Sequence, residues 1–388
     1  MGKNFRDGVV IAGVAESEVG VLPHRTEQQL HAQAASRALA DAGMTLADVD
    51  GVLSIGSSRG TRMPSVQVAE YLGITPSFSD SSSLGGCSFE AYVQHAALAI
   101  DAGLCTTCLI TYGSTQRSSG AGFGGGADPW LASTQFEGLW GLPMMTGAYA
   151  LAASRHMHLY GTTREQLAEV AVAARKWAQL NPQAPRHEDL SIEDVLSAPM
   201  IATPLGKFDC CLVTDGGGAV VVTKADRARD LPRAPVWLWG SAETHTHASI
   251  ANMPDLTVTP AAITGPAALK SAGVTPADMD LAMIYDSFTI TALMSLEDLG
   301  FCRKGEGGAF VSDGRIAPGG EFAMNTQGGG LSYTHPGMYG IFLIVEAVRQ
   351  IRGEAGARQV ATDLALVHGT GGALSAGSTL ILGKEARR

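Results

Sequence analysis

The amino-acid sequence predicts an α/β protein made of two copies of one folding unit, with an inserted region between them. The segment ALADAGMTLADVD (38–50) recurs as ALKSAGVTPADMD (268–280), and the two align without gaps. Further along each copy, at 89–113 and 338–369, an amphipathic helix ends near a glycine and leads into an apolar strand. Such self-similarity indicates an internal duplication, in which the copies bury apolar surface together.

The composition supports a large α/β fold and excludes some classes of function. A chain of 388 residues with 48 glycines, 45% hydrophobic and 16% charged residues is typical of two or three packed units. The net charge is −10 and no run of five basic residues occurs, so we expect no nucleic-acid partner. The opening MGKNFRDGVVIAGVA lacks the pattern of a signal peptide, and no apolar run approaches about 18 residues. We therefore expect a cytoplasmic protein without a membrane span.

The cysteines favour a reducing compartment and no metal site. Six cysteines lie mostly inside apolar stretches, as expected of free thiols. The sequence CTTC (105–108) is a lone C-x-x-C, and the pairs HMH (156–158) and HTH (245–247) have no second ligand pair beside them.

The first half is predicted to begin at residue 1, with its first part ending at 114. Its first helix ends at Gly43, where glycine can adopt the left-handed conformation. A second helix starts in the sequence LGGCSFEAYVQHAALAIDAG (84–103), directly after Cys87. Many acyl-transfer enzymes keep their nucleophile at the head of a helix, so Cys87 is a candidate nucleophile.

Residues 115–235 are predicted to form an inserted loop or cap region that covers a pocket and then returns to the first half. The stretch SSGAGFGGGAD (118–128) is expected to be a flexible loop, because no strand-to-helix context supports phosphate binding. A helix is expected to open at Thr163, with Gln166 completing a capping box.

The second half is predicted to span 236–388 and to repeat the plan of the first. Gly273 matches Gly43, and matching Gly103 to Gly353 places the turn that carries Cys87 against the turn THPG (334–337). The two following helices would direct their N-termini to one pocket. Free N–H groups and positive dipole ends at such a place would stabilise a developing oxyanion.

These features together resemble the thiolase superfamily: two αβ repeats, a glycine-led helix start near residue 87, HPG in the second half and HGTGG near the C-terminus. The inserted sequence RHMHLYGTTREQLAEVAVAARKWAQLNPQA (155–184) is similar to the sterol-carrier-protein-x branch and its bacterial relatives. The resemblance covers nearly the whole chain. It implies two βαβαβαββ halves in a five-layered α/β/α/β/α core, a homodimer and acyl-CoA substrates.

The sequence departs from that family at the nucleophile. The family keeps a cysteine in a C-x-S-type turn, and counting back from AIDAG places Gly86 at that position, with Ser88 on the serine of the motif. Cys87 is then off by one residue, which on a helix is about 100° of rotation. A shift of one residue at the glycine-rich turn would restore the alignment, so both interpretations of Cys87 stay open.

The second half departs from the family as well. In YDSF, Tyr285 stands where thiolases keep Asn or His, and Asp286 follows it as a neighbour that could orient it or cap a turn. His368 of HGTGG replaces the second cysteine. His335 of THPG matches the family histidine, and Tyr333 precedes it by two residues. Condensation through an acyl-cysteine loses its chemistry in such a site.

Tyr285, Tyr333, His335 and His368 are therefore the predicted catalytic residues. Retro-aldol cleavage of a β-hydroxyacyl thioester needs a base for the hydroxyl, a donor for the thioester oxygen and an acid for the enolate carbon. A tyrosine base at neutral pH needs a pKa lowered by a cation or by hydrogen-bond donors, and His335 and the helix N-termini are the expected sources.

The pattern resembles the thiolase-like aldolases that shorten steroid side chains. This resemblance implies a carbon–carbon lyase acting on a steroid or other bulky side-chain CoA ester, and a small OB-fold, zinc-ribbon-type protein as partner. It implies no cofactor beyond the coenzyme A of the substrate. Two alternatives stay open: a CoA-dependent acyltransferase or thiolase that uses Cys87, and a catalytically silent subunit that binds acyl-CoA or lipid or scaffolds a partner.

Overall fold

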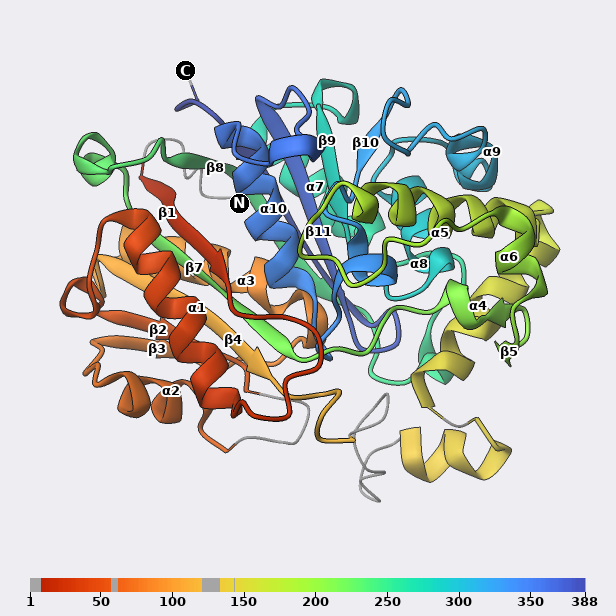
Figure 1. The fold of residues 1–388 in the computed structure, drawn as a ribbon, viewed down its shortest axis with the longest axis horizontal. Helices are drawn as coiled ribbons and strands as arrows, with labels where there is room; N and C mark the ends of the chain where they lie inside the picture. The colour runs from red at the N-terminus through yellow and green to blue at the C-terminus, as the bar shows by residue number, and fades with distance from the viewer. Residues whose placement is uncertain (1–7, 57–61, 121–132, 143, 388) are drawn as a thin grey trace.

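The computed structural model describes residues 8–56, 62–120, 133–142 and 144–387 (Figure 1). The glycine-rich loop expected at 118–128 lies mostly outside these ranges. One ten-stranded sheet runs through both halves in the order β10-β9-β11-β12-β8-β1-β7-β4-β2-β3. The halves join where β1 pairs with β8 antiparallel, Val10 opposite Trp237 and Ile11 opposite Val236.

The first half contributes five strands and three helices. They are β1 (Val9–Glu16), α1 (Glu27–Ala42), β2 (Gly51–Leu53), α2 (Pro64–Leu72), β3 (Phe78–Asp80), α3 (Ser88–Asp101), β4 (Thr107–Ser114) and β7 (Gly216–Lys224). β2 lies parallel to β3 and β4, and β7 lies antiparallel between β4 and β1.

The second half repeats the first. Its elements are β8 (Val236–His245), α7 (Ala261–Ala272), β9 (Leu281–Ile284), α8 (Thr289–Asp298), α9 (Gly307–Val311), β10 (Ala323–Met324), α10 (Gly340–Arg352), β11 (Leu364–Gly371) and β12 (Ala376–Gly383). β9 lies parallel to β10 and β11, and β12 lies antiparallel between β11 and β8. Counted along each half, the strands stand in the same spatial order, which is what a duplication produces.

The duplication extends to single residues. α1 and α7 end at Gly43 and Gly273, whose φ angles are 66° and 69°. In the first strand of each half, a glycine allows the helix to approach directly. A Cβ on Gly13 would clash with the Ala38 carbonyl of α1, and one on Gly240 would clash with the Ala268 carbonyl of α7. These close contacts fix each outer helix on its half of the sheet.

The predicted layers are present, and the fold class is confirmed. α3 and α10 contact each other and both halves of the sheet, so they form the central layer (Figure 1). α1 covers the outer face of the first half, and α7 covers that of the second. The largest apolar cluster fills the central layer, where the side chains of α3 and α10 meet β4, β7, β9 and β11.

The described part of the insertion packs on the second half. It contains α4 (Met144–Tyr160), α5 (Arg164–Gln179), α6 (Ile192–Ser197) and the hairpin of β5 (Met200–Ala202) and β6 (Leu205–Gly206). Thr163 caps α5 in a capping box with Gln166, as predicted. α4 and α5 contact α8, and the chain then returns to the first half as β7. No helix among the described residues has both the length and the apolar character that crossing a bilayer requires.

Candidate active site

A cavity of about 200 Å³ lies where the two halves and the insertion meet. It is bounded by the turn before α3, the end of β9, the turn before α10, the end of β11, the N-terminal part of α4 and the segment before β7. The wall consists of Gly85, Gly86, Gln116, Met145, Tyr149, Cys211, Val213, Tyr285, Ser287, Phe288, His335, Gly337, Met338, Thr370, Gly371 and Gly372. The turns before both central helices are thus in the wall, as the pseudosymmetry predicts.

Tyr285 is placed by the strand that precedes it. β9 ends at Ile284, and the Tyr285 N–H continues the pairing by donating to the His368 carbonyl at 2.9 Å. The side chain of Asn325 fixes the strand end, because its Oδ1 accepts from Ile284 N–H at 2.8 Å and its Nδ2 donates to the Ile284 carbonyl at 2.7 Å. The phenol of Tyr285 therefore enters the cavity from a rigid support.

The Tyr285 oxygen makes two hydrogen bonds. It lies 2.9 Å from Nε2 of His335 and accepts the N–H of Tyr339, the residue before α10, at 3.0 Å. Because the phenol oxygen already accepts the N–H of Tyr339, its own hydrogen can be directed to Nε2. The two rings meet edge to face with centroids 5.7 Å apart. Phenol, imidazole and helix N-terminus form one connected unit.

Both side chains of this pair are neutral, for the same physical reason. Burial disfavours the charged form of each group. Burial raises the pKa of Tyr285 well above its usual value, and it lowers the pKa of His335 to about 4. The expected lowering of a tyrosine pKa is therefore wrong for Tyr285, since burial also keeps His335 from being a cation at neutral pH. The N–H of Tyr339 favours the phenolate, but burial outweighs it.

His335 is held by its backbone. Its N–H donates to Oγ1 of Thr214 at 3.0 Å, and that hydroxyl also lies 2.8 Å from Oγ1 of Thr334. Asp286 fixes the turn just before, accepting the N–H groups of Gly330 at 2.7 Å and Leu331 at 3.3 Å. Burial raises the pKa of Asp286 to about 7. Asp286 thus caps a turn that leads to His335 and does not bond Tyr285.

Cys87 does not line the cavity. Its thiol is buried and lies 3.2 Å from the Leu84 carbonyl, to which it donates. Burial and the neighbouring Glu90 raise its pKa well above the usual value, so the thiol is protonated. Gly86 occupies the cavity wall instead, and a Cβ there would lie 2.5 Å from Cε2 of Tyr285 and 2.6 Å from the Thr370 carbonyl. No nucleophilic side chain fits at residue 86.

His368 points away from the cavity. Strand side chains alternate between faces, and the next residue, Gly369, faces Cys87 and Glu90 in the central layer. His368 lies on the other face, with Nδ1 2.8 Å from Oγ1 of Thr379, and that hydroxyl is 2.8 Å from Thr264 of α7. Burial lowers the pKa of His368 to about 3. The structure thus leaves this predicted catalytic residue outside the site.

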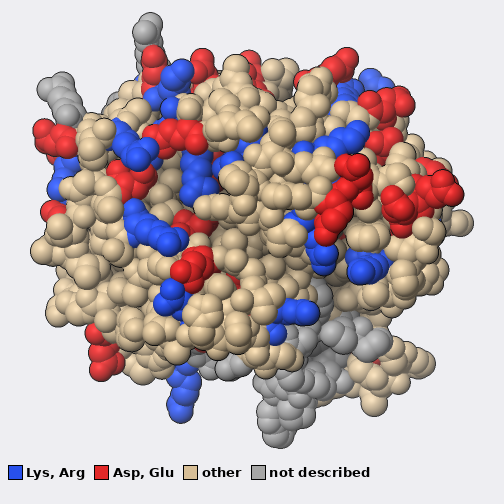
Figure 2. Space-filling model, in the orientation of Figure 1, with Lys and Arg blue, Asp and Glu red and all other residues tan. Residues whose placement is uncertain are grey.

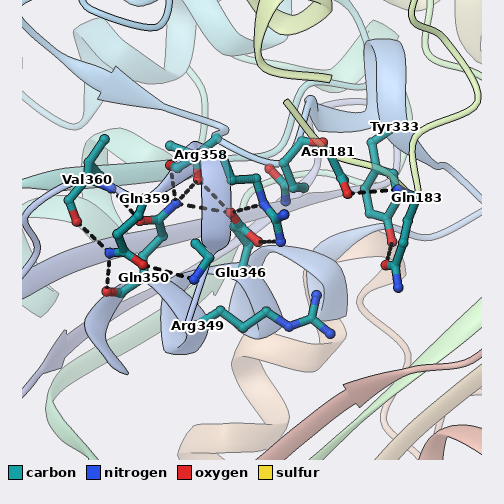
Figure 3. A network of polar contacts seen from close by, with 12 residues as sticks. Asn181, Gln183, Tyr333, Glu346, Arg349, Gln350, Arg358, Gln359 and Val360 are labelled. Carbon is teal, nitrogen blue, oxygen red and sulfur yellow. Dashed lines mark hydrogen bonds and ion pairs between the residues drawn. The ribbon is translucent and has the colours of Figure 1, made fainter. Parts of the chain in front are cut away.

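Tyr333 is also outside the cavity wall. Its hydroxyl donates to Oε1 of Gln183 at 3.3 Å, and its ring packs edge to face on Phe342 (Figure 3). It stands beside a buried polar network in which Arg358 holds Glu346 through two bonds, at 2.8 and 3.0 Å. Of the four predicted catalytic residues, the structure brings Tyr285 and His335 together and leaves Tyr333 and His368 apart.

Two wall residues were not found from the sequence. Tyr149 of α4 donates to the Gly372 carbonyl at 2.9 Å and packs on Phe288, with ring centroids 4.4 Å apart. Cys211 is a buried thiol in the wall whose pKa is raised well above the usual value by burial. The contacts of Tyr149 depend on how the insertion folds over the pocket, so no local sequence pattern predicts that this residue lines it.

Among the described residues, no group of three or more His, Cys, Asp or Glu side chains is arranged to hold a metal ion. The cavity wall carries the phenols of Tyr149 and Tyr285, the imidazole of His335, the thiol of Cys211 and the hydroxyls of Ser287 and Thr370. Because Gly86 has no side chain and Cys87 does not line the cavity, this arrangement suits proton transfer better than acyl transfer.

Comparison with known proteins finds relatives of the thiolase type. A family model described as thiolase C-terminal domain-like matches residues 242–384. The chain is 37% identical over 364 residues to a 17-hydroxy-3-oxo-4-pregnene-20-carboxyl-CoA lyase of Mycobacterium tuberculosis, covering 88% of this chain and 91% of the relative. It is 34% identical over 364 residues to a steroid side-chain-cleaving aldolase of Thermomonospora curvata, with coverages of 88% and 90%. A solved structure described as an Ltp2-ChsH2(DUF35) aldolase superposes with a TM-score of 0.87, 33% identity and 97% coverage of both chains.

Proposed function

The chain belongs to the thiolase superfamily and is a thiolase-like aldolase, a carbon–carbon lyase, and from this we propose that Tyr285 and His335 carry its retro-aldol chemistry. One observation carries the proposal. The Tyr285 hydroxyl lies 2.9 Å from Nε2 of His335, and the ring of Tyr285 lies beside Gly86, where the resemblance places the nucleophile of a thiolase.

The reaction needs a relayed deprotonation of the β-hydroxyl and a protonation of the α carbon, and it needs no covalent intermediate. As the β-hydroxyl gives its proton to the Tyr285 oxygen, the phenol proton passes to the neutral imidazole of His335. The bond between the α and β carbons then breaks, leaving a ketone and the enolate of the shortened acyl-CoA. A proton returned to the α carbon completes the reaction, so protons balance and no dissociable cofactor is consumed. The neutral state of His335 makes it an acceptor at neutral pH.

The proposed substrate is a β-hydroxyacyl-CoA with a bulky, steroid-like side chain. The names of the two relatives support this class. A cavity of about 200 Å³ holds the thioester and the reacting carbons. Pockets that enclose a whole drug-sized ligand reach roughly 300–1,000 Å³, so the rings would extend beyond this cavity, along the insertion.

We propose a homodimer that binds a small OB-fold, zinc-ribbon-type protein in the cytoplasm. The solved relative named as an Ltp2-ChsH2(DUF35) aldolase supports a partner protein. Phe136, Leu139 and Trp140 of the insertion support an interaction surface, since their side chains are 64%, 81% and 89% exposed. The free cysteines support a reducing compartment.

The test is direct. The protein is incubated with 17-hydroxy-3-oxo-4-pregnene-20-carboxyl-CoA, and the products are separated by chromatography and mass spectrometry. We expect equal amounts of propionyl-CoA and the 17-ketosteroid, with no acyl group on Cys87. An acyl adduct on Cys87 that turns over would instead establish the acyltransferase, and bound but uncleaved ester would establish a silent binding subunit.

A further inference from the structure

The proposed reaction leaves the donor of one proton open, the proton that returns to the α carbon. Tyr285 and His335 hold the proton of the β-hydroxyl when the bond between the α and β carbons breaks. Because the Tyr285 hydroxyl then bonds the new carbonyl oxygen, a different wall group is better placed to protonate the α carbon. On the face shown in Figure 2, Lys, Arg, Asp and Glu side chains are spread over the surface, whereas the described cavity wall contains none of them. A donor within this wall is therefore a neutral hydroxyl or thiol.

Two of these wall groups can be compared as acids. Phenols and thiols serve as general acids, whereas alcohols such as those of Ser287 and Thr370 rarely do, which leaves Tyr149 and Cys211. Burial raises the pKa of the Cys211 thiol well above its usual value, and neighbouring acidic groups raise it further. The thiolate that Cys211 would leave behind is therefore poorly stabilised.

Tyr149 has neighbours that stabilise its anion. Its hydroxyl donates to the Gly372 carbonyl at 2.9 Å. Burial raises the pKa of the phenol to about 12, while hydrogen bonding to the Ser287 hydroxyl and to the Leu374 backbone acts in the opposite direction. The phenol therefore keeps its proton at neutral pH, and hydrogen-bond partners are already present for the phenolate that remains once the proton has been given up.

The insertion holds Tyr149 firmly in the cavity wall. The Tyr149 ring packs on Phe288 with centroids 4.4 Å apart. His156 lies about two helical turns further along α4, on the same face of the helix. Its Nε2 lies 2.9 Å from Oε2 of Glu297 on α8, and both side chains of this pair are fully buried. α4 is thus fixed to α8 at one point and to the cavity wall at another.

The turn of Gly85 and Gly86 lies next to the supports of both phenols. A Cβ on Gly85 would lie 2.8 Å from the backbone nitrogen of Gly372, whose carbonyl holds Tyr149. A Cβ on Gly86 would lie 2.5 Å from Cε2 of Tyr285. The two phenols therefore meet one cavity with different partners, since Tyr285 bonds an imidazole and Tyr149 bonds a neutral carbonyl. Such a pair can act on two different atoms of one substrate.

From these observations we propose that Tyr149 is the acid that protonates the α carbon of the enolate. The inference rests on the proposed function, which supplies that enolate. The O–H bond of Tyr149 breaks as the new C–H bond forms, and the phenolate remains beside Ser287. The phenolate then regains a proton from solvent while the imidazolium of His335 releases one, so no proton is gained or lost over the cycle. The insertion thus contributes a reacting group to the site as well as a cover.

The experiment follows the configuration of the product as well as the rate at which it forms. Cleavage of 17-hydroxy-3-oxo-4-pregnene-20-carboxyl-CoA in D2O places a deuterium on the α carbon of propionyl-CoA and makes that carbon chiral. A fixed donor delivers the deuterium to one face, so the wild type should give a single configuration, measured by NMR of the propionate as a chiral ester. Tyr149→Phe keeps the ring and its packing, and we expect kcat to fall about a hundredfold and both configurations to form. The matched control is Tyr160→Phe, whose side chain is 38% exposed at the end of the same helix and which should keep the rate and configuration of the wild type.

Other outcomes overturn the inference. An unchanged rate and configuration in Tyr149→Phe would show that Tyr285 and His335 return the proton themselves. A lower rate with a single configuration would mean that Tyr149 only shapes the wall. Both configurations from Cys211→Ala, with a single one from Tyr149→Phe, would move the role to the thiol.

A second measurement separates this inference from the proposed function. If the wild type does not cleave the ester, the proposed function fails, and deuterium exchange at the α carbon of propionyl-CoA still tests Tyr149, because the donor of a proton in one direction is its acceptor in the other. Exchange about tenfold slower in Tyr149→Phe than in the wild type, with normal exchange in Tyr160→Phe, supports the inference. Equal exchange in both variants, or no exchange by the wild type, contradicts it.

Discussion

The ring of Tyr285 occupies the space that a side chain at residue 86 would need: a Cβ on Gly86 would lie 2.5 Å from Cε2 of the tyrosine. A side chain at residue 86 and the Tyr285 ring therefore exclude each other. The proposed proton-transfer mechanism depends on this relationship.

Removing the Tyr285 hydroxyl should abolish most of the lyase activity. Tyr285→Phe keeps the ring and its packing but loses the bonds to His335 and Tyr339, so kcat should fall by roughly 10²–10⁴ with little change in substrate binding. The matched control is Tyr333→Phe, because the Tyr333 hydroxyl bonds Gln183 outside the cavity. Steady-state kinetics that show equal losses in both variants would contradict the assignment of Tyr285.

Residues 86 and 87 should respond in opposite ways to substitution by alanine. Cys87→Ala should retain most of kcat, because the thiol bonds the Leu84 carbonyl and does not line the cavity. Gly86→Ala should lose activity, because its Cβ would press on the Tyr285 ring and the Thr370 carbonyl. Circular dichroism checks that both variants fold. A Cys87→Ala variant that folds yet loses more than about a hundredfold in kcat would restore the nucleophile hypothesis.

Glu90 should make the protein less stable as the pH rises. Neither carboxyl oxygen has a hydrogen-bond partner, and burial raises its pKa to about 8 from 4.5. Between these values the unfolded chain is ionised while the folded one holds the proton, so stability is lost as the pH rises from 4.5 to about 8.

Glu90→Gln removes this titration. Its free energy of unfolding relative to wild type should increase across that window, at up to about 1.4 kcal/mol per pH unit, and then level off. Urea unfolding at several pH values measures the difference. A difference that does not change with pH would show that Glu90 is already ionised in the folded protein.

The exposed apolar residues of the insertion should matter for assembly with the proposed partner. The double variant Leu139→Ser with Trp140→Ser should bind the small OB-fold, zinc-ribbon-type protein more weakly. The partner is taken from the native host and co-expressed with each variant, and light scattering of the purified protein measures how much complex forms. The control is Ile263→Ser on α7, whose side chain is 54% exposed. Complex formation that is lost equally in the control would not support this surface, and unchanged binding in the double variant would exclude it.

The fold could be predicted well from the sequence because the two copies share local sequence signals, such as helix-ending glycines and capping residues. Gly43 and Gly273 end matching helices, and Thr163 caps α5 as its motif indicates. Tyr285 and His335 lie together in one cavity wall, since each stands at a motif next to the end of a strand or the start of a helix, and their catalytic role stays a prediction. Tyr333 was predicted from its place two residues before His335, and His368 from its match to the second cysteine of the family motif. Neither signal says which face of a turn or strand a side chain takes. The position of Tyr149 depends on the packing of the insertion and has no local signal.

The site is shared between the halves, which has a consequence for folding. Gly86 comes from the first half and Tyr285 from the second, and β1 meets β8 at the junction. Each half can pair its own strands before the two dock, but the contact between Gly86 and Tyr285 joins segments far apart in the chain, a class of contact that forms slowly. When the denatured chain refolds, lyase activity should therefore return after most of the secondary structure has formed, so that recovered turnover reports completed docking of the halves.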